Sequence, residues 1–254
     1  MLQFFRKKAL FGTDAALNEN MPNHPRYMVI DDQSYFHVTW KCHNSDWLLQ
    51  SEWAKKMYYN LLLRFKERYK IQIFSYCFMS NHPHITGYCE ERELFSDFFR
   101  IVNSLFARAY NKRHARRGQV VMDRFKSPQI KSDADLEKVM FYVDLNPVRA
   151  GMIKHPKEYE FTSFHYYAHG KFDPLITPAP SYLEMGSSPR QRQKIYSKMV
   201  EEILKDDWKK KKPYSSIAFI GNPMWVKNKT HDLKLAQKKR RQEWQKRFDQ
   251  RFNE

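Results

Sequence analysis

The chain has 254 residues, of which 42% are hydrophobic and 16% aromatic, so we expect a folded protein with a sizeable core. Its formal net charge of +17 favours a polyanionic partner, with nucleic acid ahead of an anionic membrane surface. No apolar run approaches the roughly 18–20 residues that span a bilayer, and the N-terminal segment lacks the apolar region of a signal peptide. Cys42, Cys77 and Cys89 show no CxxC spacing, which predicts a reduced cytoplasmic chain without a disulfide framework or zinc ribbon.

Predicted strands and helices follow one another over the first 170 residues. A flexible leader over 1–25 is followed by runs rich in β-branched and aromatic residues, which predict strands over 27–42, 71–79 and 82–89. Apolar residues at helical spacing predict helices over 51–69, 93–114 and 132–146, and residues 119–130 are expected to be extended or loop-like. This order predicts an α+β domain over 26–170, with helices packed on a largely antiparallel sheet.

The remaining segment, 171–254, is predicted to be a basic and mainly helical extension. It opens with a proline-bearing linker, KFDPLITPAPSY, and continues with a predicted helix over 191–204. The stretch LKLAQKKRRQEWQKRFDQRF predicts a basic helix at the end of the chain. Such a helix could bind duplex or hairpin DNA along its backbone, or it could be a solvated helix with no partner.

Two histidines stand one residue apart in CFMSNHPHI, residues 77–85. Because alternate residues of a strand share a face, His82 and His84 would point the same way, with Pro83 and Ile85 on the other face. Two imidazoles on one face supply two metal ligands, and a third must come from elsewhere. The alternative is two unrelated histidines in a turn, since this spacing often occurs by chance.

A partner for the histidines occurs in FYVDLNPVRAG, residues 141–151. On a helix, Tyr142 and Asn146 lie four residues apart and so share a face, with Asp135 on the same flank two turns earlier. This flank borders the apolar stripe, so we expect Tyr142 to be neither in the core nor fully in water. The alternative is a tyrosine that borders the core and an asparagine in ordinary turn chemistry before proline.

Together, MSNHPHI and FYVDLNPVRAG resemble the REP-associated tyrosine transposases, single-tyrosine transposases of the His-hydrophobic-His nuclease class. YFHVTWKC, FARAYNKRHARRG, DRFKS and FTSFHYY extend the resemblance over roughly residues 25–168, in the right order and spacing. The resemblance implies a ferredoxin-like (RRM-like) antiparallel sheet that carries the histidines on a central strand, beside a helix that carries the tyrosine. It also implies a cytoplasmic, nucleoid-associated bacterial protein.

The resemblance assigns chemistry to the same residues. It implies that His82, His84 and Asn146 bind a divalent metal, and that Tyr142 attacks single-stranded DNA to form a 5′-phosphotyrosine link and a free 3′-hydroxyl. Imidazoles and an amide oxygen without thiolates suit Mg²⁺ or Mn²⁺. The residue between the histidines is usually bulky and hydrophobic in this family, whereas here it is Pro83.

Two alternatives follow from that departure and from the composition of the site. If Pro83 twists the two histidines apart, the protein is a DNA-binding protein on the same fold that does not cleave. A metal-dependent hydrolase without a covalent step is the third hypothesis, disfavoured because no carboxylate stands at an obvious spacing from the histidines. Tyr110 is a rival nucleophile that we expect to pack against Phe106. His37 could approach the site from an adjacent strand, but it is expected to be a core or edge histidine.

Basic residues near these motifs are candidates for DNA contacts. The first choices are Arg124 and Lys126 in DRFKS, together with Arg149 after the tyrosine helix. Arg113, Arg116 and Arg117 lie at a predicted helix end, where they contact phosphates or form a solvated face. The resemblance implies single-stranded or hairpin DNA as the partner, recognised as short imperfect palindromes, and the long C-terminal segment favours a monomer over a homodimer.

Overall fold

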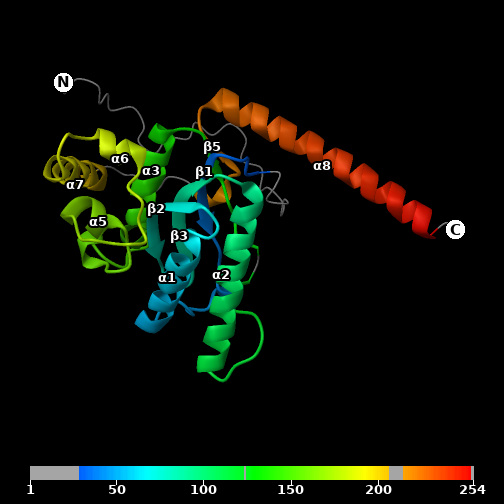
Figure 1. The fold of residues 1–254 in the computed structure, drawn as a ribbon, viewed down its shortest axis with the longest axis horizontal. Coiled ribbons are helices and arrows are strands. Elements are labelled where there is room, and N and C mark those ends of the chain that lie inside the picture. Colours follow the sequence, from blue (N-terminus) through cyan, green and yellow to red (C-terminus); the bar gives the residue numbers. More distant parts are fainter. Residues whose placement is uncertain (1–28, 123, 206–213, 253–254) are drawn as a thin grey trace.

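The chain forms a five-stranded sheet in the computed structural model, which describes residues 29–122, 124–205 and 214–252 (Figure 1). The three predicted strand regions supply three of these strands, and the other two are two-residue strands that were not predicted. The strand order is β2(Ile71–Phe78), β3(Pro83–Cys89), β1(Ser34–Thr39), β4(Gln129–Ile130) and β5(Phe219–Ile220). The first four strands pair antiparallel with the order and connections of a ferredoxin-like fold, as predicted. The fifth pairs parallel with β4, so the sheet is mixed, because a two-residue segment from the C-terminal part of the chain joins its edge.

Two long helices, α1(Glu52–Lys66) and α2(Arg92–Arg113), pack on one face of the sheet and on each other. The first begins where the Ser51 side chain accepts a hydrogen bond from the Ala54 amide, which satisfies one free donor of the first turn. On the sheet, a Cβ at Gly87 would lie 2.0 Å from the Gln72 carbonyl oxygen and 2.7 Å from the Phe36 ring. Only glycine fits there, which lets the Phe36 ring enter the core between sheet and helices.

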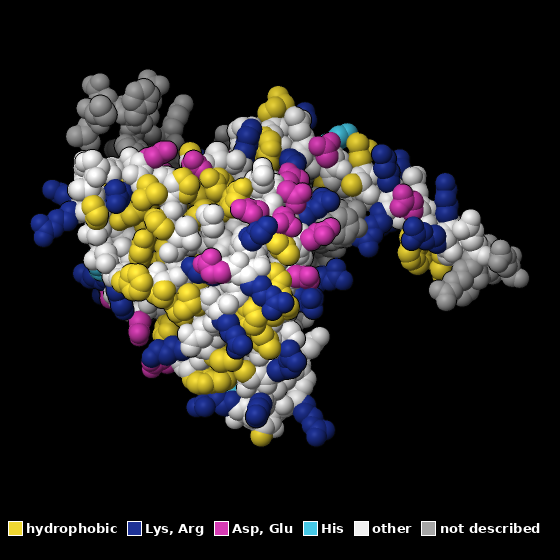
Figure 2. Space-filling view, in the orientation of Figure 1, with side chains coloured by type: hydrophobic (Ala, Val, Ile, Leu, Met, Phe, Trp, Pro, Cys, Tyr) yellow, Lys and Arg dark blue, Asp and Glu magenta, His cyan; other side chains and the backbone are white. Residues whose placement is uncertain are grey.

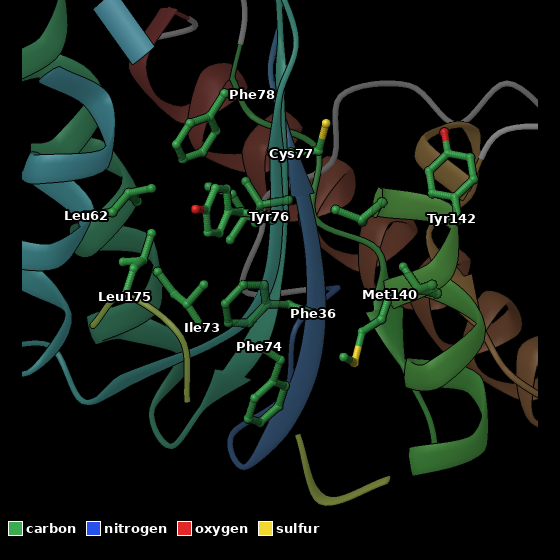
Figure 3. Packing of buried hydrophobic residues seen from close by; sticks show 14 of the residues in the cluster. Phe36, Leu62, Ile73, Phe74, Tyr76, Cys77, Phe78, Met140, Tyr142 and Leu175 are labelled. Carbon is green, nitrogen blue, oxygen red and sulfur yellow. The ribbon is translucent and has the colours of Figure 1, made fainter. Parts of the chain in front are cut away.

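A third helix, α3(Asp133–Asp144), lies on the opposite face of the sheet. Figure 3 shows Met140 and Tyr142 on one side of the strands and Leu62, Tyr76 and Phe78 on the other. The helix begins where Ser132 Oγ accepts a hydrogen bond from the Asp135 amide at 3.3 Å. The predicted helix 132–146 is in fact two helices, because α3 ends at Asp144 and α4(Asn146–Arg149) begins with a proline in its first turn.

The buried carboxylate of Asp144 joins α3 to the chain that follows it. Its oxygens accept hydrogen bonds from Thr162 at 2.8 Å, Ser163 at 2.5 Å and Tyr196 at 2.7 Å. Tyr196 belongs to α7(Pro189–Lys205), so the helix predicted over 191–204 packs against α3 through this carboxylate. Burial raises the pKa of Asp144 to about 6, and the three hydroxyl donors oppose that shift. Short elements between them are η3(Pro156–Glu158), α5(Phe164–His169) and α6(Pro180–Glu184).

The last helix, α8(Pro223–Phe252), extends away from the rest of the molecule (Figure 1). Leu233 anchors it, since this side chain is 2% exposed and packs with Val29 and Phe219. An ion pair between Lys229 and Asp31 adds a second attachment. The helix predicted over 233–252 therefore starts ten residues earlier than expected.

Some expectations concern residues that the structure does not describe. The flexible leader 1–25 and most of the charged segment KDDWKKKKP lie outside the described residues. Within the described parts of the chain, none of the helices combines the length and apolar character needed to cross a bilayer. The three cysteines are buried and carry free thiols.

Candidate active site

Three histidines gather on the sheet face that packs against α3. Antiparallel pairing sets His37 opposite Thr86 and Thr39 opposite His84, so His37 and His84 are diagonal neighbours on adjacent strands. Their rings stack with centroids 5.2 Å apart, and His37 Nε2 lies 3.0 Å from His84 Nδ1. Pro83 is the first residue of β3, a position where the missing amide donor is tolerated.

His82 directly precedes β3 and its ring meets that of His84. The two ring centroids lie 4.8 Å apart with the planes nearly perpendicular. His82 Nδ1 lies 2.5 Å from the side-chain oxygen of Asn81, an acceptor, so Nδ1 carries the proton and Nε2 keeps its lone pair. His84 Nδ1 is occupied by His37. Both members of the predicted pair therefore have Nε2 as the nitrogen left to bind a ligand.

Tyr142 projects from α3 onto this histidine cluster. Its ring lies edge-on to His84, with centroids 5.6 Å apart, and to His37 at 5.9 Å. The guanidinium of Arg149 lies 5.3 Å from the centre of the Tyr142 ring. We expected Tyr142 to lie between the core and water, and this prediction was wrong, because the residue is buried and only 3% exposed. Tyr214 packs on it with ring centroids 5.1 Å apart.

Asn146 begins α4, one turn beyond Tyr142. Its side-chain nitrogen donates a 2.8 Å hydrogen bond to the backbone oxygen of Tyr142, and the residue is 6% exposed. That bond fixes the amide relative to the tyrosine backbone and does not use the side-chain oxygen. The tyrosine and the asparagine are thus held together as their spacing predicted.

Burial keeps the three histidines neutral near pH 7. It lowers the pKa of His37 to about 3 and that of His82 to about 4, with smaller contributions from His82 in the first case and Lys41 in the second. Burial is also the main cause that holds the pKa of His84 well below its usual range. Electrostatic repulsion from His82, His37 and Arg149 lowers this pKa further. A neutral imidazole is the form that binds a metal ion, so the environment suits a ligand role.

The donor set fits a divalent ion that accepts mixed nitrogen and oxygen ligands. Metal–nitrogen bonds are about 2 Å long, so two imidazoles whose rings lie 4.8 Å apart can share one ion. In the described residues no group of three or more His, Cys, Asp or Glu side chains is placed to hold a metal. Asn146, the predicted third ligand, keeps its side-chain oxygen outside its hydrogen bond to Tyr142, and an amide oxygen is a ligand that hard divalent ions accept.

The candidate DNA-binding residues fall into two groups. Lys126 is paired with Thr39, whose other neighbour in the sheet is His84, so this exposed lysine lies in the same row as the histidine. Arg124 is exposed two residues before it. The guanidinium of Arg149 lies over the Tyr142 ring.

The second group lies at the end of α2 and in the following loop. Arg113 lies over the Trp53 ring at 4.6 Å, and Arg116 donates to the Gln119 backbone oxygen, while Arg117 is exposed. Cys42 connects this loop to the turn before β3 that contains His82. It pairs with Val121, and its backbone N–H donates to the Asn81 backbone oxygen. Tyr110, the rival nucleophile, packs on Trp53 and His114.

Several residues that shape the site were not identified from the sequence. The partner of His37 could not be predicted because it depends on the register between two strands. Tyr214 comes from a short helical turn, η5(Tyr214–Ser216), some seventy residues after Tyr142, and no local pattern marks it. Asp135, expected on the same flank as Tyr142, bonds to Ser132 and Lys138 at the start of its own helix.

Comparison with known proteins gives a family match and similar solved structures. Residues 31–145 match the family described as "Transposase IS200 like". A solved structure of a REP-associated tyrosine transposase bound to a REP hairpin is similar to this one, with a TM-score of 0.50 and 21% sequence identity. The similarity covers 62% of this chain and 92% of the other, so it supports the shared fold. No match to a curated protein was found.

Proposed function

We propose that the chain, which over residues 31–145 matches the family of IS200-like transposases, is an enzyme that cleaves and rejoins single-stranded DNA through Tyr142. The observation that supports this proposal best is the position of the Tyr142 ring against His84, at 5.6 Å, with His82 next to it at 4.8 Å. The expected substrate is the single strand beside a hairpin formed by a short imperfect palindrome. The similar solved structure holds a REP hairpin, which supports that choice.

His82, His84 and Asn146 would hold a Mg²⁺ or Mn²⁺ ion, through Nε2 of each imidazole and the amide oxygen. When bound, such an ion polarises the scissile phosphate and neutralises part of its charge. His37 is a positioning residue in this proposal, because its Nε2 at 3.0 Å orients the His84 ring. The other ring nitrogen of His37 is buried without a hydrogen-bond partner, so the hydrogen bond that the structure gives this ring is the one to His84.

The covalent step conserves the number of phosphate ester bonds. The Tyr142 phenol loses its proton to water and its oxygen attacks phosphorus. The bond from phosphorus to the 3′ oxygen breaks, and the departing strand end takes up a proton from water to become a 3′-hydroxyl. Tyr142 then carries the 5′-phosphate, and attack by a 3′-hydroxyl reverses the step without an external energy source. Arg149, 5.3 Å from the ring centre, is a cation placed to favour the phenolate.

Access to the phenol requires a local movement. Because Tyr142 is 3% exposed and Tyr214 packs on its ring, DNA can approach the oxygen only after neighbouring groups shift. Arg124, Lys126 and Arg149 would contact the phosphates of the strand nearest the site, and Arg113, Arg116 and Arg117 those of a more distant segment. The burial of Tyr142 also favours the second candidate function, a hairpin-binding protein that does not cleave.

The test is covalent capture of a labelled hairpin oligonucleotide with a single-stranded flank, in Mn²⁺. The wild-type chain should form an adduct that survives denaturation, and Tyr142→Phe should form none while binding the same DNA. Tyr110→Phe is the matched control and should retain the adduct. No adduct from the wild-type chain, with DNA binding intact, would leave the non-cleaving function; an adduct lost only in Tyr110→Phe would move the nucleophile to α2.

A further inference from the structure

The outer part of α8 presents two different halves to solvent. Residues 234–249 are exposed apart from residues 236 and 237, and in Figure 2 Lys and Arg side chains lie along this projecting helix. With about 100° between successive residues, one half of the helix circumference over residues 234–249 carries three arginines, two lysines and no acidic residue. These are Lys234, Lys238, Arg240, Arg241 and Arg247. The other half carries two lysines and two acids, Lys239, Lys246, Glu243 and Asp249, and is neutral overall.

The basic half also carries the two aromatic side chains of this segment. Trp244 is 60% exposed and Phe248 is 42% exposed, and their rings stack with centroids 5.2 Å apart. By helical phase, Trp244 lies between Arg241 on one side and Arg247 on the other. Two exposed aromatic rings in contact form a small apolar patch, which is more informative than a single exposed hydrophobic residue. Their place between two arginines indicates a ligand with both negative charge and flat apolar faces.

The orientation of this face relative to the rest of the molecule follows from the anchored part of the helix. Leu233, which packs with Phe219 of β5, lies within about 20° of Trp244 around the helix axis. The face that packs on the sheet edge near residue 233 therefore continues outward as the basic and aromatic face. A ligand bound there would lie on the same side of the helix as the folded domain.

We propose that this face of α8, centred on Trp244 and flanked by Arg241 and Arg247, binds single-stranded DNA, with phosphates on the arginines and a base stacked on the indole. Single strands match it better than a duplex does, because unpaired bases expose the flat faces that stack on aromatic rings. The proposal rests on the proposed function, since the strand would be the flank of the same substrate. It adds a second contact region far along the chain from the histidine centre.

The experiment measures the affinity of the full chain for a labelled 20-nucleotide oligo-dT in EDTA, so that cleavage does not contribute. Trp244→Ala should weaken binding about tenfold, the loss expected for one base stack, while Trp244→Phe should restore most of it. The double variant Arg241→Gln/Arg247→Gln should also weaken binding and reduce the salt dependence by about 1.4 in the slope of log K against log salt. Lys239→Gln/Lys246→Gln, with the same change in net charge, is the control and should have a much smaller effect.

Four results would overturn the proposal. These are an unchanged affinity in Trp244→Ala, equal weakening by the two double variants, a larger loss on duplex DNA than on oligo-dT, or loss of a dimer in solution when Trp244 is replaced. The result is separable from the cleavage chemistry. If the Tyr142 adduct is absent but Trp244→Ala still weakens binding, the proposed DNA contact on α8 stands and the cleavage proposal fails. If the adduct forms and Trp244→Ala binds normally, the cleavage proposal stands and the contact on α8 fails.

Discussion

The histidine–tyrosine centre and the outer half of α8 are built in opposite ways. His37, His84 and Tyr142 expose 0%, 2% and 3% of their surface, whereas Trp244 exposes 60%. In the centre, strand register and helix packing fix each ring against its neighbour, so geometry is well defined and access is restricted. On α8 the side chains are accessible to solvent, so the region can supply affinity but does not enclose and position a reacting atom.

The largest effect expected from this difference is on the covalent step. Tyr142→Phe removes the attacking oxygen, so adduct formation should fall by on the order of 10³-fold or more at saturating hairpin DNA. The α8 variant Trp244→Ala should leave the rate of adduct formation at saturating DNA unchanged. It should change only the DNA concentration that gives the half-maximal rate. A drop in the saturated rate for Trp244→Ala would show that the two regions do not act separately.

The next effect tests whether His37 orients His84. Replacing His37 by Phe keeps a planar ring but removes the atom 3.0 Å from His84 Nδ1, so Mn²⁺ affinity should fall about 10- to 100-fold. His37→Gln, whose amide can reach a similar position, should recover part of that affinity. Isothermal titration with Mn²⁺ gives both values without reference to cleavage. Equal Mn²⁺ affinity in the wild-type and Phe chains would reduce His37 to a packing residue.

Acid should destabilise the centre through the same residue. The folded-state pKa of His37 is lowered to about 3, so the unfolded chain takes up a proton below about pH 6.5 when the folded chain does not. The stability that His37 contributes is therefore full above pH 6.5 and is lost as the pH falls towards 3. Between pH 6.5 and 5 this amounts to about 2 kcal/mol.

Urea unfolding of the wild-type chain and of His37→Phe over that pH range isolates this contribution. The unfolding free energy of the wild-type chain minus that of His37→Phe should fall as the pH falls, because only the wild-type chain has the imidazole at position 37. Asp144 acts in the opposite sense in both chains, since its raised pKa favours the folded state at low pH and loses that effect as the pH rises through about 6. A difference that is constant with pH would contradict the burial argument.

The smallest effect is expected at Pro83. It occupies the first residue of β3, where a proline costs little, so Pro83→Val should change the free energy of unfolding by less than about 1 kcal/mol. Adduct formation should change little as well. A large gain in adduct formation in the valine variant would support the view that proline impairs this site.

Local patterns predicted much of this arrangement, and long-range packing produced the rest. The alternation in HPHI predicted that the His82 and His84 side chains lie together, and the four-residue spacing predicted Asn146 beside Tyr142, because both depend only on local geometry. The split of the tyrosine helix at Asp144 and the His37–His84 contact depend on tertiary packing and strand register. The same holds for Tyr214, whose arrival over Tyr142 turned an expected flank position into a buried one.

The most direct test of the central claim is a crystal structure of the chain soaked with Mn²⁺ and measured at a wavelength where manganese scatters anomalously. We predict one strong anomalous peak within bonding distance of His82 Nε2, His84 Nε2 and the Asn146 side-chain oxygen, beside the Tyr142 ring. A peak elsewhere, or no peak at an Mn²⁺ concentration that supports DNA cleavage, would contradict the account.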